Sequence, residues 1–388
     1  MTIQEVAAKY SEYQIEMRRY FHENPELSYK EFNTSSKVKE ELDKMNIPWR
    51  VCGSETGILA TITGKKPGKT ILLRGDMDAL EVKEETGLPY ASKTEGVMHA
   101  CGYDCHISML LTAAHILNDM KDELSGTVKL AFQPAEELAC GAVGMIQDGA
   151  LEGVDGCFAI HVWSDIESGK VVCNAGPAMA SVGRFKIEMQ GMGGHGATPH
   201  LCVDAAVAAS ATILNLQTIV SRELSPQDSA CVTVGYVRSG DRFNCVADSA
   251  YMEGTTRAFS RDVSGSFEER ITRIARDTAK AFRTEAVVTY DHLTDPVVND
   301  ADMAELVQTA ARDVVASDAP IQYPPLSPGE DFAYFMNEVP GAVALLGVRN
   351  VDCNAIWPQH SNKYCVDEKF LLHGAMLYAK VALSFNKK

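Results

Sequence analysis

Residues 127–163 read TVKLAFQPAEELACGAVGMIQDGALEGVDGCFAIHVW, and this stretch decides the fold. It contains an apolar run at 127–132, a segment at 141–150 that favours a helix, and a second apolar run at 157–163. Continuous apolar runs of this length are typical of strands that are buried on both faces. A helix between two such strands predicts a sheet with parallel strands and helices packed on it.

The same alternation extends to both sides of this stretch. Before it, we predict helices at 3–23, 33–44 and 104–120 and strands at 57–62 and 70–73. Near the C-terminus, we predict a helix at 301–316, a strand at 342–347 and a final helix from about residue 367. Together these elements predict an α/β domain with a parallel or mixed sheet.

The middle of the chain has a different order of elements. We predict strands at 184–190, 230–237, 248–258 and 286–290, with helices at 203–222 and 268–283. The order β-α-β-β-α-β is the ferredoxin-like pattern, which makes a complete small domain by itself. The sequence therefore predicts a catalytic domain built from residues 1–182 and 293–388, into which a second domain, residues 183–292, is inserted.

Composition excludes several classes of partner. The chain has 388 residues, 46% hydrophobic content and a formal net charge of −16. Nucleic acids and anionic membranes attract basic surfaces, so we expect neither as a partner. No apolar run approaches the ~18 residues of a membrane helix. The eleven cysteines are scattered, and the first residues show no signal-peptide pattern, so we expect a reducing cytoplasmic location.

Acidic and imidazole side chains gather where the apolar runs stop. Glu136 and Glu137 follow one run, Asp76 and Asp78 follow another, and His161 lies in a third. An open α/β sheet builds its site at the ends of its strands. Each residue also has a plainer interpretation, because adjacent acids often face solvent, Asp favours turns and a lone histidine is often part of the core.

The segment Met98–His106, MHACGYDCH, adds further candidate ligands. Cys101 could bridge two cations as a thiolate, Glu137 and His360 would suit one cation, and His161 would suit the other. A buried thiol and a surface-loop histidine are the alternatives for Cys101 and His360. Zinc and manganese both fit a mixed S, N and O donor set, and cobalt and nickel are further candidates.

Catalytic roles follow from the same positions. Glu136 follows an apolar lead-in, so we expect a buried carboxylate that serves as general base, with Glu137 as a ligand. We expect Asp78 to orient a ligand or to line the pocket. In the inserted domain, His195 lies in a glycine-rich loop and could donate to an oxyanion, although such loops are usually tight turns.

Two more residues of the inserted domain are candidates for binding substrate. Arg257 could hold a substrate carboxylate through two parallel hydrogen bonds, although a surface ion pair is an equal alternative. Asn244 lies in the same domain.

These motifs resemble the amidohydrolase branch of the aminoacylase/carboxypeptidase metallopeptidase family, which includes hippurate hydrolases, N-acetyldiaminopimelate deacetylases and indoleacetyl-amino-acid hydrolases. The segments that carry the resemblance are 18–28 (RRYFHENPELS), 76–80 (DMDAL), 84–89 (EETGLP), 132–137 (FQPAEE), 159–163 (AIHVW) and 193–197 (GGHGA). They extend over nearly the whole chain.

The resemblance implies a dinuclear metal site in the larger domain and a smaller domain that covers the site and forms a homodimer. It implies that Cys101 bridges the metals, that Glu137, His161 and His360 are ligands and that Glu136 is the base. It also implies that His195 polarises the scissile carbonyl in the partner subunit's site. Asn244 and Arg257 match substrate-side positions in the smaller domain.

One position departs from the family pattern, because Tyr103 stands where the family has a histidine ligand. A phenol holds its proton to a pKa of ~10, so tyrosine is a poor ligand near neutral pH unless a cation lowers that pKa. Either Tyr103 binds metal as a phenolate, or one metal position is weak or empty. The sequence thus predicts one or two divalent metals per chain.

The leading prediction is a metal-dependent amidohydrolase that cleaves the amide bond of an N-acyl amino acid or a related small molecule. A metal-bound water would be the nucleophile and Glu136 the general base. The alternative is a family member with an altered metal site, either a small-molecule binder that does not hydrolyse or a mononuclear enzyme of different chemistry. Retention of Glu136 and the other ligands favours the first, and Tyr103 favours the second.

Overall fold

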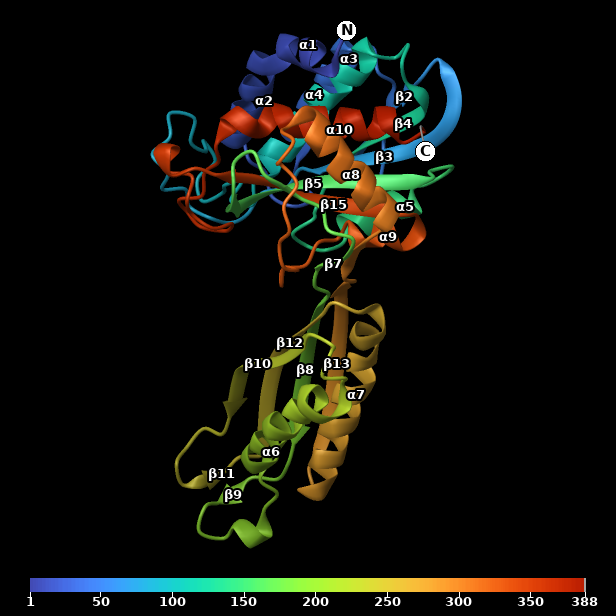
Figure 1. Cartoon of the computed structure of the whole chain (residues 1–388). Coiled ribbons are helices and arrows are strands. Elements are labelled where there is room, and N and C mark those ends of the chain that lie inside the picture. The colour runs from blue at the N-terminus through green and yellow to red at the C-terminus, as the bar shows by residue number, and fades with distance from the viewer. Residues whose placement is uncertain (387–388) are drawn as a thin grey trace. The chain divides into compact units, whose positions relative to one another are not determined.

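The computed structural model describes residues 1–386 of the chain. It divides into two compact units (Figure 1). The first contains Met1–Ala178, Val298–Pro324 and the chain from Asp331 onward, and the second contains Met179–Val297 and Pro325–Glu330. The limits that the sequence predicts are 182/183 and 292/293.

The short segment Pro325–Glu330 belongs to the second unit although it follows the return of the chain to the first. Leu326 forms an isolated β-bridge with Met179. Gly329 lies so close to Val182 and Thr294 that a Cβ atom there would be 2.3 Å and 2.7 Å from their side chains. Contacts of this kind depend on tertiary packing, so no local sequence pattern predicts them.

The first unit is built on a seven-stranded sheet with the order β1-β2-β4-β3-β5-β15-β6. Its strands are β1 (Trp49–Val51), β2 (Ile58–Thr63), β3 (Lys66–Asp76), β4 (Ser125–Gln133), β5 (Gly156–Glu167), β6 (Val171–Val172) and β15 (Gly341–Arg349). The pairs β3/β4, β3/β5 and β5/β15 are parallel, and the pairs β1/β2, β2/β4 and β6/β15 are antiparallel. The predicted α/β fold with a mixed sheet is therefore confirmed.

Helices cover both faces of this sheet, with α4 and α10 on one face and α5 and α9 on the other (Figure 1). The α-helices of the unit are α1 (Ile3–Ala7), α2 (Ser11–Glu23), α3 (Phe32–Lys44), α4 (Tyr103–Asp119), α5 (Gly141–Gln147), α8 (Ala301–Val314), α9 (Ala333–Glu338) and α10 (Leu371–Ser384). Strand β3 lies between β4 and β5 in the sheet. After β3 the chain runs through α4 to β4 on one side of β3, and then through α5 to β5 on its other side. Ligand sites in open α/β sheets form where the strand order reverses in this way.

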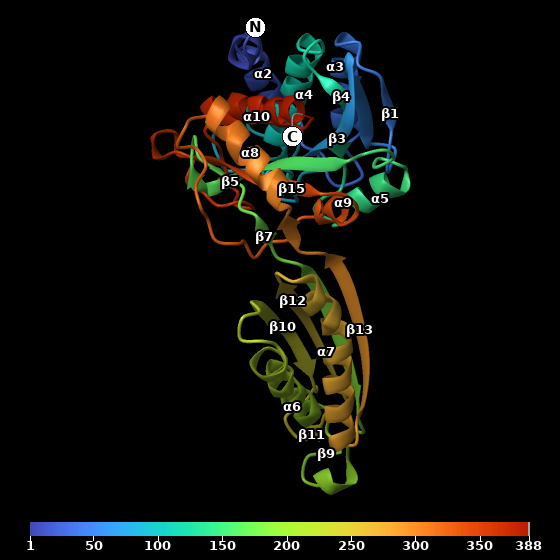
Figure 2. The ribbon, with the colours of Figure 1, turned by 45° about the vertical axis from the view of Figure 1, so that its right-hand side comes forward.

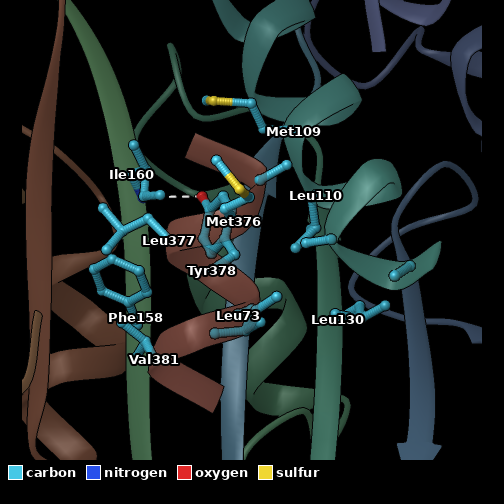
Figure 3. Close-up of a cluster of buried hydrophobic side chains, with 14 of the residues drawn as sticks. Leu73, Met109, Leu110, Leu130, Phe158, Ile160, Met376, Leu377, Tyr378 and Val381 are labelled. Atoms are coloured by element: carbon cyan, nitrogen blue, oxygen red, sulfur yellow. Dashed lines mark hydrogen bonds between the residues drawn. The ribbon is translucent and has the colours of Figure 1, made fainter. Parts of the chain in front are cut away.

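The core between the sheet and its helices sets the positions of the strand ends (Figure 3). Leu73 of β3, Leu130 of β4 and Phe158 of β5 are fully buried, with Leu110 of α4 and Leu377 of α10. Burial of each such side chain contributes roughly 1.5–3 kcal/mol. The core therefore holds the central strands in fixed register.

One buried tyrosine joins β3 to β5 beyond the point where their pairing ends. The register of the two strands ends at Arg74 and Ala159. The Tyr378 hydroxyl accepts a hydrogen bond from the Ile160 backbone N–H at 2.9 Å (Figure 3). It donates to the Arg74 carbonyl at 2.6 Å. This bridge satisfies backbone groups that would otherwise be buried without partners, so the two strands can separate next to the site.

The second unit contains a four-stranded antiparallel sheet with the order β10-β12-β8-β13. Its main elements are β8 (Val182–Gln190), α6 (Ala205–Thr218), β10 (Ala230–Ser239), β12 (Ser249–Ala258), α7 (Arg261–Ala281) and β13 (Glu285–Thr294). Both helices pack on one face of the sheet (Figure 2). Phe185 and Met252 of the strands and Phe267 of α7 are buried between the sheet and the helices. The burial of the two strand residues follows from the alternating pattern of the strands.

No helix within residues 1–386 is both long and apolar enough to cross a membrane. All eleven cysteines are free thiols.

Candidate metal centre

Three donor atoms from distant parts of the sequence converge in the first unit. The Cys101 sulfur, a Glu137 carboxylate oxygen and a His360 ring nitrogen all lie within 4.8 Å of one another. Cys101 is buried just before α4, Glu137 follows β4, and His360 comes from the loop after β15. Sulfur, nitrogen and oxygen donors at this spacing fit a zinc or manganese ion, so these residues can hold one divalent cation.

His161 also lies beside the Cys101 sulfur, with its Nε2 atom 3.6 Å from the sulfur. Its Nδ1–H donates to the Val162 carbonyl at 2.7 Å, so the lone pair of Nε2 faces Cys101. Burial lowers the pKa of His161 to about 3. The ring is therefore neutral near pH 7 and has a free lone pair, as a ligand requires.

Asp76 lies at the end of β3 and supports His161 indirectly. Its carboxylate pairs with Arg74 and accepts a hydrogen bond from Nδ1 of His106. Nε2 of His106 accepts from the Val162 backbone N–H at 2.9 Å, and the ring packs edge-on against His161 at 4.7 Å. Asp76 thus fixes the tautomer of the histidine that packs against His161.

Asp78 is buried beneath the two adjacent glutamates. It accepts hydrogen bonds from the backbone N–H groups of Glu136 at 2.9 Å and Glu137 at 3.0 Å, and from the Ser28 hydroxyl at 2.7 Å. Burial raises the pKa of Asp78 to about 6. Asp78 thus fixes the turn in which the two glutamates lie, and Ala135, just before them, has the rare positive φ of 52°.

Glu136 points to a different set of neighbours from Glu137. The Tyr103 hydroxyl donates to its Oε2 at 2.6 Å, and the Asp331 backbone N–H donates to its Oε1 at 3.2 Å. Its side chain is buried. Burial, reinforced by Cys101 and Glu136, raises the pKa of Tyr103 well above its ordinary value, so the phenol keeps its proton and acts as the donor.

The candidate residues of the second unit lie in two places. His195 belongs to β9 (Gly194–His195), which pairs with β11 (Cys245–Val246). Its Nδ1 accepts a hydrogen bond from the Ala197 N–H at 3.0 Å, so Nε2 carries the proton of the neutral ring. The Asn244 carbonyl accepts from the Gly196 N–H at 2.8 Å, which places Asn244 beside this loop.

Arg257 lies on β12. It donates to the Thr255 hydroxyl at 2.5 Å and to the Thr256 carbonyl at 2.7 Å. The guanidinium is half-buried, and burial lowers its pKa. These contacts are with its own strand and leave other N–H groups of the guanidinium for further partners.

Sequence reasoning missed several residues that shape the site. Asp331 is buried, accepts from Gln133 at 2.7 Å and from Arg74 at 3.0 Å, and holds Glu136 through its backbone. Its only local signal is an acidic residue directly before the apolar residues Phe332 and Ala333. Glu31 was missed as well, and its carboxylate accepts from the Ala135 N–H at 3.0 Å.

An α/β sheet that gathers sulfur, nitrogen and oxygen donors beside a buried carboxylate is the arrangement of a metal-dependent hydrolase. Residues 72–384 match the model of peptidase family M20/M25/M40, and the chain belongs to this family. The family resemblance found in the sequence is thereby confirmed.

Individual relatives agree with this assignment. The N-acetyl-L-cysteine deacetylase of Bacillus subtilis is 40% identical over 377 residues, which cover 96% of this chain and 89% of the relative. The IAA-amino acid hydrolase ILR1-like 2 of Arabidopsis thaliana is 38% identical over 97% of this chain and 86% of its own length. The crystal structure of the YXEP protein of Bacillus subtilis, described as a dinuclear metal-binding peptidase of family M20, has a TM-score of 0.87 and 32% identity and covers 98% of this chain and 99% of that chain. This chain is therefore an enzyme of the amidohydrolase and peptidase type.

Proposed function

We propose that the chain hydrolyses the amide bond of an N-acyl amino acid or a related small molecule, with a divalent cation on Cys101, Glu137 and His360. The convergence of these three donor atoms within 4.8 Å is the observation that carries the proposal. The deacetylase and IAA-amino acid hydrolase relatives support this class of substrate. Zinc, manganese, cobalt and nickel are the candidate cations, and the number bound is one or two.

The roles of the residues follow from their positions. A cation bound there supplies Lewis-acid chemistry and lowers the pKa of a water molecule toward neutrality. Glu136, one residue from a ligand, takes a proton from that water and passes it to the leaving amine. Tyr103 and the Asp331 backbone, which both donate to Glu136, hold its carboxylate in place. Asp78 orients the backbone of Glu136 and Glu137.

The second unit supplies the remaining groups. We propose that it is a ferredoxin-like lid, that the chain forms a homodimer and that His195 acts at the partner subunit's site. Nε2–H of His195 is a suitable donor to an oxyanion because the hydrogen bond at Nδ1 fixes this tautomer. Asn244 and Arg257 would contact the substrate, with Arg257 pairing with its carboxylate. The free cysteines support the predicted cytoplasmic location.

Removal of the metal tests the hydrolytic proposal. Protein treated with a chelator should lose hydrolysis of a panel of N-acetyl, N-benzoyl and indoleacetyl amino acids, measured as release of free amine. Addition of zinc, manganese, cobalt or nickel should restore it. The variant His360→Ala lacks one of the three donors, and its side chain is half-exposed in the unaltered protein. Each added metal should therefore restore little hydrolysis in this variant. Amide hydrolysis that persists without metal would contradict the proposal.

Subunit exchange tests the role of His195. A dimer of one His195→Ala chain and one Glu136→Gln chain has one site in which both groups are intact, and random pairing makes about half of the dimers mixed. Each variant alone should be nearly inactive, and mixing should restore part of the activity. No recovery in a preparation shown to contain mixed dimers would place His195 in its own chain's site or outside catalysis.

The hydrogen bond from Tyr103 to Glu136 favours a second candidate, a member of the family that binds small molecules without hydrolysing them. A carboxylate that already accepts a short hydrogen bond is a weaker base. In that case the panel would show binding by calorimetry without release of amine under any of the four metals.

A further inference from the structure

The contacts of Tyr103 indicate how many divalent cations the chain binds. This inference rests on the proposed function. The three converging donors account for one cation. A second cation would lie beside Cys101, where His161 presents its Nε2 lone pair 3.6 Å from the sulfur. Zinc sites use three or four protein ligands, so the second position needs a further donor besides Cys101 and His161.

The side chain available there is Tyr103, the first residue of α4. It is 2% exposed and packs beside two imidazoles, with ring centroids 5.3 Å from His106 and 5.8 Å from His161. Its hydroxyl donates to Glu136 at 2.6 Å. The phenolic proton is therefore directed to Glu136.

We propose that this chain binds a single divalent cation, on Cys101, Glu137 and His360, and that the hydroxyl of Tyr103, which donates to Glu136, occupies the place where a second cation would need a ligand. A hydroxyl that donates to Glu136 offers a cation only a neutral phenol oxygen, which is a weaker ligand than the nitrogen lone pair of an imidazole. The hydrogen bond to Glu136 holds the hydroxyl proton in this direction. In this respect the chain differs from its relative that is described as a dinuclear metal-binding peptidase.

The number of bound cations tests the proposal without substrate. The intact protein is saturated with manganese, freed of unbound metal on a desalting column and analysed by elemental mass spectrometry. We expect one manganese per chain and an electron paramagnetic resonance spectrum of isolated ions. Tyr103→His, which supplies an imidazole, should bind two and show exchange coupling between them. The control Tyr103→Phe, which removes the hydroxyl without adding a donor, should stay at one.

Each other outcome has a definite meaning. Two manganese ions in the unaltered protein would overturn the proposal, even if Tyr103→His failed to fold. Two manganese ions per chain in Tyr103→Phe, or one manganese ion in a folded Tyr103→His, would overturn the proposal. Either result would show that the Tyr103 hydroxyl does not determine how many cations bind. A protein that binds one cation but hydrolyses no amide would contradict the proposed function and leave this inference standing. A protein that binds none would contradict both.

Discussion

Asp78 is one buried carboxylate that positions two neighbours, Glu136 and Glu137, for which we propose different tasks. It lies outside the three converging donors and instead binds the backbone N–H groups of Glu136 and Glu137. Both carboxylates depend on this turn for their direction, since the preceding Ala135 has a positive φ. A residue that holds ligands in this way is commonly worth 10–100-fold in metal affinity, roughly.

The variant Asp78→Asn should therefore bind metal more weakly while remaining folded. An amide presents one acceptor oxygen and an NH2 group, so one of the two backbone N–H groups would face another donor. We expect manganese affinity, measured by calorimetry, to fall by about 10–100-fold. Ser28→Ala is the matched control, because it removes one hydrogen bond from the same carboxylate and leaves both backbone bonds. Equal affinities in Asp78→Asn and the unaltered protein would exclude the positioning role.

At this scale the sequence predicted the residue types of the site better than their contacts. Cys101, Glu137 and His360 were candidates from position and chemistry, and the structure brings them together. Asp331 was missed because its partners Gln133 and Arg74 lie 198 and 257 residues away in the sequence. Pairings over such separations follow from strand order, which residue patterns alone do not fix.

The start of helix α4 is the element on which the site depends most. Gly102 precedes it with a φ of 89°, a conformation that glycine adopts at little cost. A Cβ atom there would lie 2.5 Å from Val162 and 2.7 Å from the Tyr364 hydroxyl. Glycine is therefore required both for the backbone conformation and for the space, and it fixes how Cys101 and Tyr103 approach the site.

The variant Gly102→Ala should be destabilised by roughly 2–5 kcal/mol, the sum of backbone strain and overpacking. Gly153→Ala is a matched control, since Gly153 also has a positive φ, 67°, but no atom lies within 4 Å of the added Cβ. We expect its cost to be about 1 kcal/mol. Urea unfolding of both variants measures the difference. A Gly102→Ala variant no less stable than the control would show that the contacts with Val162 and Tyr364 relax freely.

Predicted elements failed mainly where tertiary contacts override local pattern. The single helix expected at 3–23 is divided by a 3-10 turn at Ala8–Tyr10. There the Lys9 ammonium and the Tyr10 hydroxyl both bind Asp119 at the end of α4. Helix α7 begins at Arg261, seven residues before the predicted start at 268. Its early turns bury Val263 and Ser264 against the sheet, a preference that the local sequence shows weakly.

The first unit as a whole contains two buried ion-pair networks. Arg74 and His106 surround Asp76, and Arg18 and His22 surround Asp104. Burial opposes the charge of both carboxylates. Arg74 and the hydrogen bond from His106 nevertheless hold the pKa of Asp76 below its ordinary value of 3.8, and Arg18 and His22 do the same for Asp104. A lowered pKa in the folded state stabilises the fold above pH 3.8, and this contribution is lost as the pH falls through the folded-state value.

The free energy of unfolding should therefore fall steeply as the pH drops below about 4. Asp104→Asn should make this dependence shallower and cost up to about 3–5 kcal/mol near neutral pH, because Arg18 and His22 would lose their buried carboxylate and Arg18 would keep only Glu368. The control Asp122→Asn removes an exposed carboxylate paired with Lys65 and should leave the dependence unchanged. Denaturant titrations at several pH values measure both. The same acid slope in Asp104→Asn and the unaltered protein would contradict this origin.

Alternation of helix and strand predicted the mixed sheet of the first unit, and the motifs predicted the family, because both depend on local sequence. The limits of the two units depend on contacts such as that between Met179 and Leu326, which no local pattern reveals. The direction of the Tyr103 hydroxyl toward Glu136 likewise became visible only in the folded molecule.

The central claim is that Glu136 and Glu137 have different tasks. The decisive measurement therefore compares the variants Glu136→Gln and Glu137→Gln, with metal content and turnover determined on the same samples. Glu136→Gln should keep its metal and lose about 10²–10⁴-fold in turnover, the usual worth of a general base. Glu137→Gln should lose the metal and, with it, the activity. Turnover near that of the unaltered protein in Glu136→Gln, with metal bound, would contradict the account.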